Sequence, residues 1–91
     1  MERMRVEKSM GLRIFGSLDQ FLRVVNTLRR SSAEVKSLEA KFFGNEILAL
    51  VRLEGRPEEI DWALRKVFAL PEVRSAELME ALRLAELKQS G

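Results

Sequence analysis

The apolar positions of this chain change their spacing several times, and each change predicts a new secondary-structure element. In the first stretch, residues 10–16, Leu12 and Ile14 fall on one side and Arg13 on the other, which predicts a strand. After it, helical and strand-like spacings follow one another. The expected elements are a helix over 17–30, strands over 34–43 and 46–55, a helix over 57–70, a strand over 72–78 and a helix over 79–89.

The expected first helix has an apolar side and a polar side. Ser17 is placed to cap its start, and Gln20 follows three residues later, as a capping box requires. Its apolar side, at a period of 3.6, consists of Leu18, Phe21, Val24, Val25 and Leu28. Its opposite side carries Arg23, Asn26 and Arg30. This helix is therefore expected to pack on a sheet through its apolar side.

Residues 34–43 alternate as a strand with one buried face does. One side carries Lys36, Leu38, Ala40 and Phe42, and the other carries Val35, Ser37, Glu39 and Lys41. The dipeptide Gly44-Asn45 suits a two-residue hairpin turn, so residues 46–55 are expected to return beside this strand. Because the middle of 46–55 is apolar on both faces, we place it in the centre of the sheet.

The order of these elements predicts an α+β fold, the ferredoxin-like βαββαβ sandwich. Two right-handed crossovers give a four-stranded antiparallel sheet with two helices on one face, and a C-terminal helix follows. The chain has 91 residues, which is enough for one domain. The expected division is an N-terminal extension over 1–9, the domain over 10–78, and the C-terminal helix and tail over 79–91.

Composition narrows the classes of function. The chain has no cysteine and no histidine, which excludes disulfides and the usual zinc sites and removes the commonest general acid or base. It also has no phosphate-binding glycine loop, so we expect no enzymatic activity, no cofactor and no metal. No apolar run is long enough to cross a membrane and no secretory signal is visible, so a cytoplasmic location is expected. A net charge of +2 does not favour nucleic acid as a partner.

Residues 17–78 resemble an ACT domain and are most similar to the small regulatory subunit of acetohydroxyacid synthase (acetolactate synthase). The family's first helix carries an "L-x-R-V" run and its second strand an "I/V-x-S-L/M" run, here Phe21 to Val24 and Val35 to Leu38. Its second helix often opens with proline and an "I/V-D" pair, here Pro57 and Ile60-Asp61. Its closing "L-x-x-V-x-x-V/A" run is Leu70 to Ala76.

The resemblance implies a homodimer, a catalytic acetohydroxyacid synthase subunit as partner, and a small amino acid as effector. By resemblance the effector site consists of Gly16, Ser17, Asp19, Gln20 and Glu34. At the helix start the family usually has a glycine where this chain has Asp19, and it often begins the second strand with asparagine where this chain has Glu34. Both changes place negative charge where an effector's carboxylate sits. The resemblance therefore implies weak or altered effector binding.

Ordinary structural roles remain open for several of these residues. Ser17 also serves as a plain cap, Asp19 also favours the positive end of a helix, and Glu34 also fits a solvated strand position. The expected partner interface consists of Arg23, Asn26, Arg30 and Trp62, although a charged helix back is commonly just solvated. Trp62 lies nearly opposite the apolar side of its helix, so it should be partly exposed unless the terminal helix or another chain covers it.

Two alternative functions also fit the pattern. One is a stand-alone amino-acid-sensing ACT protein. The other, from a different class, is a single-stranded RNA-binding module in which Phe42 and Phe43 stack on bases; packing in a core or a dimer is the alternative role for these rings. The RNA interpretation requires exposed aromatic residues on the central strands and a steep salt dependence, and the subunit interpretation requires neither.

Overall fold

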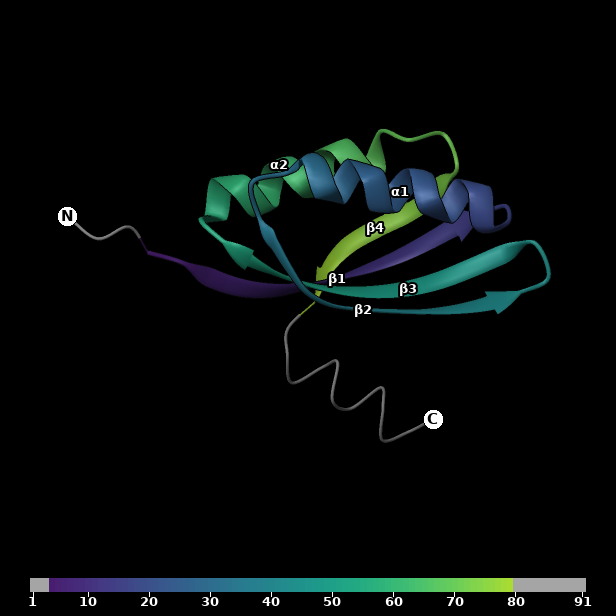
Figure 1. The fold of residues 1–91 in the computed structure, drawn as a ribbon, viewed down its shortest axis with the longest axis horizontal. Helices are drawn as coiled ribbons and strands as arrows, with labels where there is room; N and C mark the ends of the chain where they lie inside the picture. The colour runs from purple at the N-terminus through teal and green to yellow at the C-terminus, as the bar shows by residue number, and fades with distance from the viewer. Residues whose placement is uncertain (1–3, 80–91) are drawn as a thin grey trace.

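The computed structural model of the protein describes residues 4–79 as a four-stranded antiparallel sheet with two helices packed on one face (Figure 1). The strands lie in the order β2-β3-β1-β4 across the sheet. The elements are β1 (Val6–Phe15), α1 (Leu18–Arg30), β2 (Glu34–Phe43), β3 (Glu46–Gly55), α2 (Pro57–Phe68) and β4 (Val73–Met79). This is the predicted ferredoxin-like sandwich, in which the central strands β1 and β3 each lead into a crossover helix.

The first strand is longer than the sequence predicts. β1 begins at Val6 instead of Met10, and it pairs with β3 from its first residue to its last. The added part is polar and lacks the alternation that reveals a strand, yet Glu7 forms an ion pair with Arg52 of β3 at 2.7 Å. Residues 6–9, which were expected to belong to an N-terminal extension, are therefore part of the sheet.

The last described strand ends one residue later than expected. β4 closes the sheet beside β1, and its final residue, Met79, is the partner of Ser9 in the register of the two strands. Beyond Met79, the predicted C-terminal helix and tail over 79–91 lie outside the described residues. Within residues 4–79, neither helix is long and apolar enough to cross a membrane.

The hydrophobic core lies between the sheet and the helices. On β1 and β3 the residues that face the helices lie opposite one another, such as Leu12 opposite Ala49 and Ile14 opposite Ile47, and all four are buried. The buried apolar residues of the helices are Val24, Leu28, Ile60, Ala63 and Val67. Removing apolar surface from water contributes roughly 25 cal/mol per Å², so this layer is the main stabilising contact of the sandwich.

The prediction that β2 has one buried face is wrong. No residue of β2 is buried, because this strand lies at the edge of the sheet and the helices pack over β1, β3 and β4. At the start of β2 the two faces also carry other residues than the alternation predicts. A bulge between Val35 and Ser37 takes Lys36 out of the alternation, so that Val35 and Leu38 share the face toward the helices.

The predicted apolar side of α1 is correct in its middle and wrong at its start. Val24 and Leu28 are buried, but Leu18 in the first turn is 56% exposed. Thr27, which the apolar pattern does not include, is buried. Its hydroxyl donates a hydrogen bond to the Arg23 carbonyl at 3.0 Å, which removes the cost of burying it.

Candidate functional site

The corner between β1 and α1 is built on Gly16. This residue has a φ of 132°, which side chains rarely adopt, and a Cβ here would lie 2.5 Å from Gln20 Cγ. The Gly16 N–H donates to the Asn45 carbonyl at 2.7 Å, which ties the corner to the turn between β2 and β3. The corner is therefore closely packed on both of its sides.

The Gln20 side chain folds back over the start of α1. Its Oε1 accepts hydrogen bonds from the Ser17 N–H at 2.8 Å and from the Ser17 hydroxyl at 3.2 Å. The predicted capping box is formed. A backbone amide at this corner, the kind of donor that the family resemblance assigns to a ligand, is thus already satisfied within the chain.

The structure brings together only part of the predicted effector site. Gly16, Ser17 and Gln20 form the corner, and Asp19 lies exposed in the first turn of α1. Glu34 begins β2 beyond the opposite end of α1, a helix of 13 residues that spans about 20 Å. Within one chain Glu34 therefore does not reach the corner.

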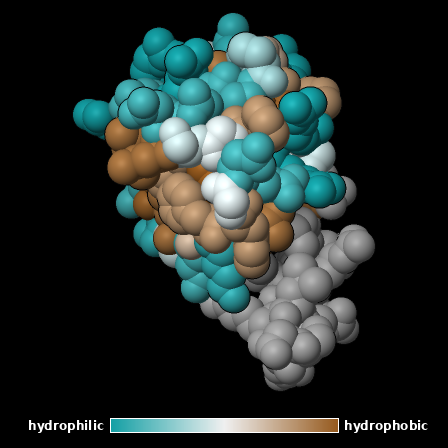
Figure 2. Space-filling view, turned by 90° about the vertical axis from the view of Figure 1, so that its right-hand side faces the viewer, coloured by the Kyte–Doolittle hydropathy of each residue, from teal (hydrophilic) through white to brown (hydrophobic). Residues whose placement is uncertain are grey.

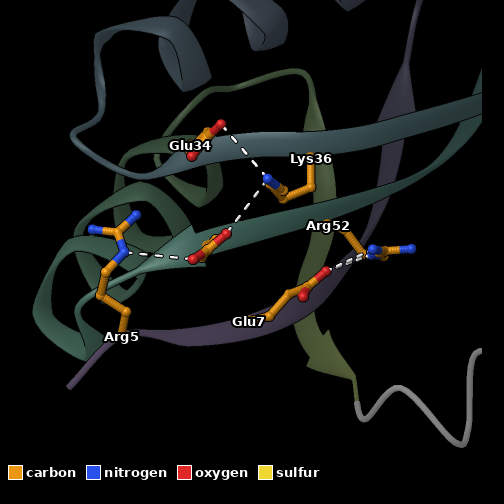
Figure 3. Close-up of polar contacts among 6 residues, drawn as sticks. Arg5, Glu7, Glu34, Lys36 and Arg52 are labelled. Carbon is orange, nitrogen blue, oxygen red and sulfur yellow. Dashed lines mark hydrogen bonds and ion pairs between the residues drawn. The ribbon is translucent and has the colours of Figure 1, made fainter.

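Glu34 instead belongs to an ion-paired cluster at the far end of the sheet (Figure 3). Its carboxylate lies 3.7 Å from Lys36 Nζ, which is also 3.5 Å from the Glu54 carboxylate. Arg5 approaches the same Glu54 at 3.5 Å. Exposed pairs of this kind contribute at most about 1 kcal/mol each, so the cluster mainly neutralises charge.

The four predicted interface residues have different surroundings. Arg23 lies 3.3 Å from the carboxylate of Glu72, whose side chain is only 7% exposed, so Arg23 is engaged within the fold. Asn26 accepts a long hydrogen bond of 3.5 Å from its neighbour Arg29. Arg30 and Trp62, from different helices, line the same groove between α1 and α2. The structure therefore brings two of the four predicted interface residues, Arg30 and Trp62, to one groove.

A strip of exposed apolar side chains is the feature that the sequence pattern missed. It consists of Leu18 and Leu22 of α1 with Val35, Leu38 and Phe42 of β2, which are between 38% and 56% exposed. We call this set the edge strip. Helical spacing places Leu18 and Leu22 on the flank of α1 away from α2. The Phe21 ring joins this flank to β2, because it meets the Phe42 ring edge-on at 5.8 Å. In the sequence, the four-residue spacing of Leu18 and Leu22 was the feature that could have revealed this strip.

Figure 2 looks at the end of the molecule where the β2–β3 turn and the start of α1 lie, and apolar side chains gather in the middle of that end. Phe15 and Phe43 belong to this end and are 45% and 54% exposed. Both lie beside Glu46 in the strand register, on the sheet face that the helices leave open. The Arg74 guanidinium lies 4.8 Å from the centre of the Phe15 ring.

Two ion pairs lie near the end of β1 and the start of α2. Arg13 donates to the Glu46 carboxylate at 2.6 Å, and this contact raises the pKa of Arg13. The backbone amide and the guanidinium of Arg56 both hydrogen-bond to Glu59 and lower its pKa. Among residues 4–79, no group of three or more acidic side chains is arranged to hold a metal ion.

Comparison with known proteins supports the fold and leaves the family open. No protein-family model matches the sequence, and no curated protein matches it. The crystal structure of the ACT domain from GTP pyrophosphokinase of Chlorobium tepidum superposes with a TM-score of 0.77 at 4% identity, covering 84% of this chain and 100% of that one. Homoserine dehydrogenase from Thiobacillus denitrificans gives 0.68 at 19% identity, covering 86% of this chain and 17% of that enzyme. The C-terminal domain of MgtC from Mycobacterium tuberculosis gives 0.62 at 10% identity, covering 87% and 89%. The chain therefore has the ferredoxin-like fold of ACT domains.

Proposed function

We propose that this chain is a non-catalytic regulatory module of the ACT type and that it acts as a homodimer. The fold shared with ACT domains supports the class. The edge strip is the observation that carries the dimer, because an edge strand with exposed apolar side chains invites pairing unless something covers it. A second copy offers a matching strip across a twofold axis.

In the proposed dimer the two β2 strands lie antiparallel, and the two sheets become one. Within residues 4–79 no strand lies beside the outer edge of β2, so we expect its backbone groups to form hydrogen bonds with a partner strand. The same arrangement brings Leu22 and Phe42 of each copy toward the partner and covers apolar surface that so small a domain leaves in water.

The more specific proposal is that the module is the small subunit of acetohydroxyacid synthase, in branched-chain amino acid biosynthesis. The runs Phe21 to Val24, Val35 to Leu38 and Leu70 to Ala76 support it by resemblance. A stand-alone amino-acid-sensing module is the alternative within the same class. In either case effector binding at the corner is weak or altered, because Gln20 fills it and Asp19 adds negative charge.

Reconstitution with the catalytic subunit from the same organism tests the specific proposal. We expect the chain to raise the rate of acetolactate formation, and we expect valine to change that rate little. Calorimetric titration of the chain alone with valine, leucine or isoleucine should give no dissociation constant tighter than about 1 mM. Micromolar binding would contradict the interpretation of the corner. If the chain does not raise the rate of acetolactate formation, the subunit assignment is wrong. The dimer is tested separately, by sedimentation equilibrium.

The single-stranded RNA interpretation has less support. Phe15 on the central strand β1 is exposed as that function requires, but Phe43 lies on the edge strand and Glu46 lies between the two rings. The face they share also carries ion pairs that neutralise its cations, such as Arg13 with Glu46 and Arg52 with Glu7. A phosphate backbone would find little net positive charge there.

A further inference from the structure

The groove between α1 and α2 is hollowed at two adjoining places that share Arg30 and Trp62. The first hollow, of about 210 Å³, is also lined by Ser32, Glu58 and Glu59. The second, of about 490 Å³, is also lined by Thr27, Lys66 and Leu70. The second hollow has the volume of a small-molecule site, which commonly lies between about 300 and 1,000 Å³.

Trp62 forms the flat wall that the two hollows share. It is half-buried and packs against the core, so its ring is held in place while part of it faces the groove. The Lys66 ammonium lies 5.6 Å from the centre of this ring. A fixed, partly exposed indole offers stacking area to a planar ligand.

Two cationic side chains, Arg30 and Lys66, line the groove. The ion pairs among the described residues give neither Arg30 nor Lys66 a carboxylate partner. Arg65, one position away on the same helix, is by contrast paired with Asp61 at 3.1 Å. Both cations line the second hollow beside the Trp62 ring. The Arg30 guanidinium offers an anion two parallel N–H donors, and the Lys66 ammonium offers it a compact positive charge.

We propose that this groove binds an anion carried on a flat ring, the chemistry shared by aromatic carboxylates and mononucleotides. The ring stacks beside Trp62 and Leu70, and the carboxylate or phosphate binds Arg30 and Lys66. The first hollow is lined by Glu58 and Glu59, whose carboxylates are ion-paired with Arg56, whereas no carboxylate lines the second hollow, which therefore suits the anion better. The Thr27 hydroxyl already donates to a backbone carbonyl, so charge and stacking, rather than that hydroxyl, hold the ligand.

This site goes beyond the proposed amino-acid-sensing role and does not depend on it. The edge strip and the groove lie on opposite flanks of α1, so a dimer formed through β2 leaves the groove open. The effector corner lies at the start of α1, whereas Arg30 is its last residue. A ligand in the groove therefore neither requires nor excludes one at the corner.

The chain provides its own probe, because Trp62 is its one tryptophan. We would titrate the full chain at low salt with benzoate and with AMP, and follow both Trp62 fluorescence and the indole N–H signal in NMR. Adenosine supplies a ring without the anion, and inorganic phosphate supplies the anion without a ring. We expect saturable changes with AMP, benzoate or both, and at least several-fold weaker binding of adenosine and phosphate. Saturation by AMP alone would identify the anion as a phosphate, and saturation by benzoate alone would identify it as a carboxylate.

Substitutions separate this site from nonspecific charge. Arg30→Gln and Lys66→Gln should each weaken binding by about two- to five-fold, the range for a partly exposed ion pair. Arg29→Gln removes the same charge one residue away, outside the groove, and should leave the affinity unchanged. If neither probe gives a saturable change up to about 10 mM, or if Arg29→Gln weakens binding as much as Arg30→Gln does, the proposal is wrong.

Discussion

Two glycines of this chain have a positive φ, and they differ in what surrounds them. Gly16 has a φ of 132° and the Gln20 side chain where a Cβ would lie, whereas Gly44 has a φ of 59° and open space where a Cβ would lie. The first glycine has no room for a side chain, and the second has room for one. At the scale of single residues, the corner therefore depends on Gly16 for two reasons, conformation and space.

Replacing each glycine by alanine separates these two reasons. We expect Gly16→Ala to lower the free energy of unfolding by about 2–3 kcal/mol, because strain adds to the contact with Gln20. Gly44→Ala keeps the strain without the contact and should cost about 1 kcal/mol. Urea unfolding of both variants measures the difference. Equal losses would show that Gln20 moves away freely, and that the corner is not the closed site described above.

At the scale of elements, the start of α2 is held by a contact that the sequence pattern did not reveal. Pro57 and the acidic first turn were the visible signals, but Arg56 is the cap. Glu59 accepts from the Arg56 N–H at 2.9 Å and from its guanidinium at 3.0 Å, which lowers the pKa of Glu59 below its ordinary 4.5. Arg56 is thereby fixed between β3 and α2.

This contact predicts a pH dependence of stability. Because the folded-state pKa of Glu59 is lowered, its ionised form stabilises the fold above about pH 4.5, and that contribution is lost as the pH falls toward the folded pKa. Glu59→Gln should therefore be less stable than the parent at pH 7, with a difference that shrinks in acid. Glu58→Gln, which keeps both Glu59 contacts, should retain the parent's acid dependence. Urea midpoints from pH 7 to about pH 3 measure this. A constant difference between Glu59→Gln and the parent would contradict the assignment.

The periods of the sequence predicted all six described elements, since each has strong alternation or a clear apolar helix side. They could not predict what covers each face. β2 alternates as a buried strand does, yet it is exposed because the helices pack mainly over β1, β3 and β4 and contact the edge strand little. Of the site, the corner of Gly16, Ser17 and Gln20 followed from local signals. The groove did not, because Arg30 and Trp62 meet only through the packing of two helices.

At the scale of the whole molecule, α1 separates two surfaces with different chemistry. Its flank away from α2 carries Leu18 and Leu22, and its flank toward α2 carries Arg30. The first surface is apolar and continuous with a strand edge, which suits a second copy of the chain. The second is cationic and aromatic, which suits a small anion. In the two proposals made above, one helix therefore contributes to an assembly surface and to a ligand groove.

The dimer through β2 is the central claim, and sedimentation equilibrium of the full chain at micromolar concentration tests it most directly. The parent should sediment as a dimer. Leu38→Lys should be a folded monomer, because lysine is well tolerated on an exposed strand edge but charges the edge strip. Phe68→Lys, an equally drastic change at an exposed site of α2 outside the strip, should remain a dimer. A parent that sediments as a monomer, or a Leu38→Lys variant that still dimerises, would contradict the account.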